Sequence, residues 1–90
     1  MTYLRPQPQG FSEPARRPDY WTQLALVSAG ASPVTAWRHA ANMSQRELAQ
    51  EAGIEVETLL QLESRALEAT PEQIRAIAWV LGLREGDLRE

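Results

Sequence analysis

The sequence has no cysteine, no lysine and only one histidine, His39. Without cysteine it can form neither a disulfide framework nor a thiolate site. No apolar run reaches the roughly 18 residues that a membrane helix needs. The first residues lack the basic-then-apolar order of a secretory signal. These absences predict a cytoplasmic protein with no membrane span.

Patterns that carry catalysis are missing as well. His39 has no serine and aspartate placed so as to identify a triad, and no glycine-rich phosphate loop or metal-spaced cluster occurs. Glu55 and Glu57 stand two residues apart, so on a helix they do not face each other. The sequence therefore argues against an enzyme, and it predicts no cofactor and no metal site.

Charge is distributed unevenly along the 90 residues, whose net charge is −3. Residues 1–33 hold three arginines against two acids, and residues 34–90 carry the remaining −4. Proteins that bind nucleic acid usually present a basic surface, because phosphate contacts supply much of the affinity. An acidic helical region therefore predicts weak non-specific binding to DNA.

Proline and helix-start signals divide the chain in two. Residues 1–18 contain four prolines and no periodic apolar pattern, which predicts a flexible arm that also carries arginines. From Asp19 onward, caps and apolar spacing predict five helices, or six if the short turn at 83–88 counts. No strand pattern is visible. The fold class expected is all-α, with one helical domain over 19–90.

The segment 44–63 carries the most information. Ser44 with Glu47 three residues later forms a capping box. A short amphipathic helix follows, then Gly53, then a second short helix without spare residues between them. Gly53 ends one helix and precedes a sharp reversal, so we expect it to have a positive φ. This order is that of a helix-turn-helix, which presents one helix to a groove.

From Trp37 to Leu88 the chain resembles the Cro/cI phage-repressor family of helix-turn-helix domains, also called Xre-like. Capping, core and turn positions agree in register. The matching residues are Arg38, Met43, Ser44, Gln45, Glu47, Leu48, Ala49, Ala52, Gly53, Ile54, Leu59, Leu62, Glu63, Ile74, Ala78, Leu81, Gly82 and Leu88. The stretch 32–38 also resembles the lead-in of bacterial antitoxin-type members. The resemblance implies a compact five-helix bundle of the phage-repressor type, here with an irregular N-terminal arm.

The resemblance also implies a binding mode and a set of contacts to double-stranded DNA. The helix at 44–52 would be the scaffold, and the helix at 56–63 would enter the major groove. Arg38 and Glu63 fall at family positions that form a buried ion pair. The residues expected to contact DNA are Gln45, Arg46, Val56, Glu57, Thr58, Gln61 and Arg65.

Several of these positions depart from the family pattern. Val56 and Glu57 stand where glutamine, arginine or lysine usually reads bases, and Leu60 stands where a polar side chain usually faces the groove. Arg65 replaces a usual glycine. A glutamate can accept a hydrogen bond from the N4 amino group of cytosine, but it repels phosphates.

Two functions remain open on this sequence. The first is a homodimeric, sequence-specific transcriptional repressor. The second is a protein-interaction module, or an antitoxin-type subunit, that keeps the fold but binds a protein partner. Large apolar residues that a small domain is not expected to bury predict the dimer interface. These residues are Trp21, Trp79, Leu83 and Leu88.

Overall fold

The computed structural model describes residues 19–90, and the arm expected at 1–18 lies outside the described residues. The described part is all-α and contains no strand, as the sequence predicts. Its elements are α2 (Tyr20–Ser28), α3 (Pro33–Ala40), α4 (Gln45–Ala52), α5 (Val56–Glu63), α6 (Pro71–Leu81) and the 3-10 turn η2 (Glu85–Leu88). Within this part, no helix is long and apolar enough to cross a membrane.

Side-chain caps start α2, α3, α4 and α6, whereas α5 begins after Glu55 without one. The Ser44 hydroxyl accepts from the backbone N–H of Glu47 at 3.0 Å, and the Glu47 carboxylate accepts from the backbone N–H of Ser44 at 2.8 Å. Thr70 and Gln73 form the same reciprocal pair at α6, with 3.1 and 2.9 Å bonds. Each box satisfies backbone donors that the first turn of a helix leaves without partners.

A glycine in the left-handed conformation caps two of the helices. Gly53 follows α4 with φ of +73°, and Gly82 follows α6 with φ of +71°. After α3 the same conformation is adopted by Asn42, at +59°. The positive φ expected at Gly53 is present. It lets the chain reverse direction within residues 53–55, which separate α4 from α5.

We expect Gly53→Val to destabilise the domain by about 1–2 kcal/mol, because a β-branched residue is strained at this φ. A Cβ placed on Gly53 would meet no atom within 4 Å, so a clash of the Cβ does not contribute to this loss. Gly86 has equal space and no positive φ, and Gly86→Val is therefore the matched control. Urea unfolding of both variants measures the difference. Equal midpoints would contradict the strain argument.

The core lies where α4, α5 and α6 meet, and α3 closes one side of it. Leu48, Leu59, Ile77 and Leu81 are the largest fully buried side chains. η2 completes the core from the C-terminal end. There Leu88 is 3% exposed, so the prediction that it supplies a dimer surface is wrong.

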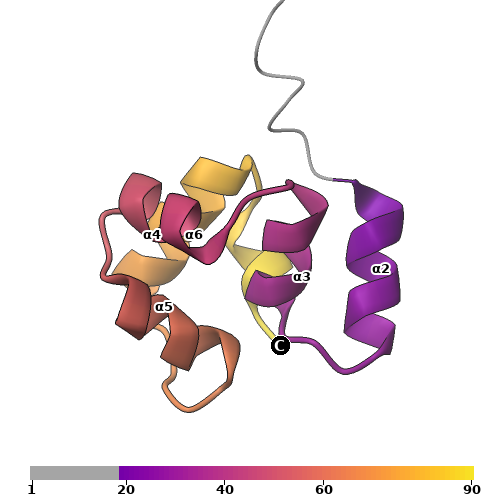
Figure 1. Cartoon of the computed structure of the whole chain (residues 1–90), viewed down its shortest axis with the longest axis horizontal. Coiled ribbons are helices and arrows are strands. Elements are labelled where there is room, and N and C mark those ends of the chain that lie inside the picture. The colour runs from indigo at the N-terminus through magenta and orange to yellow at the C-terminus, as the bar shows by residue number, and fades with distance from the viewer. Residues whose placement is uncertain (1–18) are drawn as a thin grey trace, which may run out of the picture.

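Helix α2 stands apart from this core. Its main neighbour is α3, beside which it lies (Figure 1), and none of its residues is buried. The backbone N–H of Asp19 donates to the carbonyl of Ala40 at 2.9 Å and ties the start of α2 to the end of α3. α2 therefore covers α3 and leaves most of its own surface open.

Candidate nucleic-acid interface

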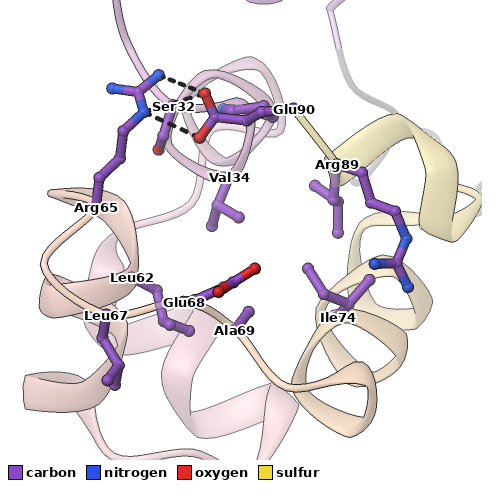
Figure 2. A pocket seen from close by; sticks show the side chains of 12 residues that line it. Ser32, Val34, Leu62, Arg65, Leu67, Glu68, Ala69, Ile74, Arg89 and Glu90 are labelled. Carbon is purple, nitrogen blue, oxygen red and sulfur yellow. Dashed lines mark hydrogen bonds and ion pairs between the residues drawn. The ribbon is translucent and has the colours of Figure 1, made fainter.

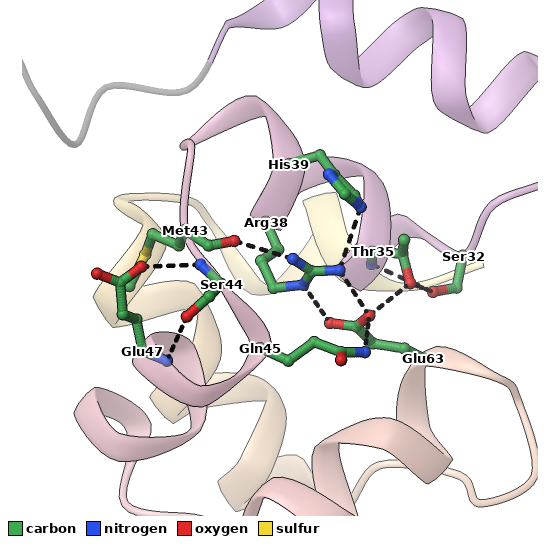
Figure 3. Close-up of polar contacts among 9 residues, drawn as sticks. All are labelled: Ser32, Thr35, Arg38, His39, Met43, Ser44, Gln45, Glu47 and Glu63. Carbon is green, nitrogen blue, oxygen red and sulfur yellow. Dashed lines mark hydrogen bonds and ion pairs between the residues drawn. The ribbon is translucent and has the colours of Figure 1, made fainter.

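A buried ion pair joins α3 to the helix expected to enter the groove. The Arg38 guanidinium donates from Nε to Glu63 Oε2 at 2.7 Å and from Nη2 to Oε1 at 3.1 Å (Figure 3). The two side chains are 8% and 6% exposed. Arg38 Nη1 also donates to the carbonyl of Met43 at 2.9 Å, in the loop before α4. This arginine therefore holds α3, the α3–α4 loop and α5 in one arrangement.

Glu63 also fixes the first residue of α4. Its Oε1 atom accepts from the Gln45 amide nitrogen at 3.0 Å and from the Thr35 hydroxyl at 3.1 Å. A carboxylate only accepts, so the nitrogen of the Gln45 amide must face it. The Gln45 carbonyl oxygen and the second N–H are left for outward contacts. Gln45 is half-buried, so its orientation is set before any ligand arrives.

The outward face of α5 is a stripe at positions i, i+3, i+4 and i+7. The residues of this stripe are Glu57, Leu60, Gln61 and Ser64, and all are exposed. Leu60 is 43% exposed. Val56 and Thr58, which were also expected to contact DNA, are half-buried, and Val56 packs against the core. Glu57 and Gln61 therefore offer more of their side chains to a groove than Val56 and Thr58 do.

Arg46 occupies the second position of α4, beside Gln45. It is exposed, and within residues 19–90 its side chain forms no hydrogen bond or ion pair. The N-terminal end of a helix carries partial positive charge and free N–H groups, which favour a phosphate. An unpaired guanidinium at this end adds to the same field, so Gln45 and Arg46 together suit an anionic backbone.

Arg65, the remaining expected contact, is engaged elsewhere. Its guanidinium donates to both carboxylate oxygens of Glu90 at 2.9–3.0 Å (Figure 2) and to the carbonyl of Gly30 at 3.2 Å. These hydrogen bonds hold the pKa of the Glu90 carboxyl below its ordinary value. The structure therefore joins Arg65 to the loop after α2 and to Glu90, so a phosphate contact by Arg65 would have to replace this exposed ion pair.

A cavity of about 530 Å³ opens beside the Arg65–Glu90 pair. Its wall is partly apolar, with Val34, Leu62 and Ile74, and partly polar, and the Glu68 carboxylate extends into it (Figure 2). The charged groups at its edge are exposed. In the described part of the chain, no group of three histidine or carboxylate side chains is placed to hold a metal ion.

Sequence reasoning missed two polar residues of this region. Ser64 extends the outward stripe, and its spacing of seven from Glu57 is a signal that a helical projection would have used. Thr35 bonds Glu63 from 28 residues away, and no local pattern reveals such a contact. The net charge of the described residues is −5, from six arginines and eleven acids. With more acidic residues than arginines, few guanidinium groups are available to contact phosphates.

Comparison with models of protein families gives one finding, a match of residues 35–88 to the model described as helix-turn-helix. The match covers more than half of the 90 residues. It begins inside α3, so α2 lies outside it. No curated protein and no solved structure matches the chain.

Proposed function

We propose that this chain, which belongs to the Cro/cI-type helix-turn-helix family of DNA-binding regulators, is a sequence-specific repressor that reads an operator with α5. One observation carries the proposal. The buried Glu63 carboxylate holds Arg38 and Gln45 at once, and so presents the start of α4 and the outward stripe of α5 as one rigid surface. A rigid pair of helices is what reading a groove requires.

In this proposal the two helices have separate tasks. The start of α4 rests on a phosphate, which Gln45 and Arg46 contact, and this sets the register of the protein along the duplex. α5 lies in the major groove with Glu57 and Gln61 toward base edges. Bound there, the protein represses by excluding polymerase.

Charge determines how selective such a protein is. With a net charge of −5 in the described part, few phosphates are neutralised, so non-specific affinity is low and the dependence of affinity on salt is shallow. Glu57 accepts hydrogen bonds but donates none, so it favours the amino group of cytosine and disfavours most other edges. Specificity therefore rests on a few base contacts.

The test is binding by the full chain to random duplexes at low salt, followed by a salt titration of the selected sequence. The proposal expects a recovered site and a slope smaller than that of a basic repressor. A pull-down from lysate runs beside it. If no duplex is retained and a protein partner protects the outward stripe of α5 from hydrogen exchange, the interaction-module function replaces this one. The exposed Leu60 on that stripe favours the alternative.

We expect Glu57→Gln to change which sequence is selected, because the amide adds a donor that suits adenine. The discrimination at one base pair should shift by roughly 1–3 kcal/mol. Glu72→Gln removes the same charge from the exposed start of α6 and is the matched control. It should raise affinity slightly for all sequences and leave the selected sequence unchanged. If both variants select the same DNA sequence as the wild-type chain, Glu57 does not contact the bases.

A further inference from the structure

Helix α2 exposes an apolar face with no charged residue along its nine positions. Trp21 is 75% exposed and Tyr20 59%, and Leu24 and Val27 add 43% and 38%. None of the other helices in 19–90 exposes as many large apolar side chains. The family match begins at residue 35, so α2 is an addition that the helix-turn-helix itself does not explain.

We propose that α2 is a self-association surface that pairs with α2 of a second copy of this chain. The distribution of charge makes α2 the surface at which two copies of this acidic chain can meet. The described part carries −5, so two copies repel each other across most faces. Contact through the one uncharged helix brings no like charges directly together. This inference deepens the proposed function and rests on it only where DNA is concerned.

The order of side chains along α2 suits a two-fold axis. Tyr20 and Trp21 make one end of the helix bulky, and Val27 makes the other end small, with Leu24 between them. In an antiparallel pair the bulky end of each helix packs against the small end of the other, and the two copies of Leu24 meet near the axis. The face is therefore complementary to itself in shape as well as in charge.

The exposed area is also of the right size. The four side chains expose on the order of 500 Å² together, at the upper end for apolar patches of monomers, and a stable interface needs about 800 Å² from each partner. The four side chains therefore supply more than half of the area that each partner contributes to a stable interface. Trp79 is 85% exposed but stands among Glu51, Glu72 and Arg75, so it offers no comparable apolar surface.

Pairing through α2 leaves the DNA-reading face free. α2 lies on the far side of α3 from α5 (Figure 1), and α3 contacts both helices. The second copy therefore extends the protein away from the outward stripe of α5. Two such stripes in one particle match two half-sites of a palindromic operator.

The experiment is analytical ultracentrifugation of the full chain without DNA. We expect the wild-type chain to be a dimer at micromolar concentration. Trp21→Glu or Leu24→Glu should raise the dissociation constant of the dimer roughly tenfold or more. The control Trp79→Glu should leave the dissociation constant unchanged. Circular dichroism checks that each variant keeps its helices. Because the chain has no cysteine, Leu24→Cys supplies a second readout. It should form a disulfide-linked dimer on mild oxidation, and Trp79→Cys should not.

Three results would overturn the inference. They are a monomer at high micromolar concentration, a dimer that only Trp79→Glu dissociates, and a monomer that dimerises only after residues 1–18 are removed. The last would show that the arm itself covers α2. All three are read in the absence of DNA, so they are separate from a failure to bind duplexes. A dimer that binds no DNA would uphold this inference and refute the proposed function.

Discussion

Arg38→Ala should destabilise the domain by about 3–5 kcal/mol, the largest effect expected from one substitution here. Removing the guanidinium leaves the Glu63 carboxylate 6% exposed and without its cation. Thr35 and Gln45 still donate to one oxygen, but neither carries charge. The carbonyl of Met43 loses its donor at the same time. For a domain of this size, whose total stability is about 5–10 kcal/mol, such a loss is a large fraction.

Urea unfolding of the wild-type chain and the variant measures this loss. Arg75→Ala is the matched control, because Arg75 pairs with Glu85 at 3.5 Å on the surface and such pairs contribute about 0–1 kcal/mol. A second variant separates burial from pairing. Arg38→Met combined with Glu63→Leu removes both charges and should recover much of the stability. An Arg38→Ala midpoint equal to that of Arg75→Ala would refute the account.

The sequence predicted best those features that depend on residues close together in the chain. The capping box at Ser44 and the reversal at Gly53 involve partners within four residues, so composition and spacing determine them. The Arg38–Glu63 pair spans 25 residues, and local chemistry did not suggest it. It was expected because the resemblance placed both residues in register.

Contacts between distant residues without such a register could not be predicted. Leu88 looked like spare apolar surface, but η2 folds back on the core, where Trp37 Nε1 donates to the carbonyl of Asp87 at 3.2 Å across 50 residues. Arg65 looked free for a phosphate, but Glu90 lies within reach of it. In both cases the cause is that residues 85–90 fold back against the domain. No periodic pattern in the sequence predicts that packing.

Arg46 is the residue whose change should affect DNA binding most, because its guanidinium has no partner among the described residues. Arg46 is exposed at the start of α4, and in the described part of the chain no carboxylate neutralises it. Arg46→Glu removes one phosphate contact and adds a repulsion at the helix end where the anion binds. We expect affinity for the selected duplex to fall roughly 100-fold at moderate salt.

This fall should be nearly equal for all sequences, because a phosphate contact carries no base information. Arg46→Gln should lower the slope of log affinity against log salt by about 0.9, which is the value for one phosphate. Arg75→Glu makes the same charge reversal on α6, near Glu51 at the other end of α4, and is the control. It should weaken binding only slightly, through net charge. If Arg75→Glu weakens binding as much as Arg46→Glu does, the effect comes from net charge alone, and the start of α4 does not rest on a phosphate.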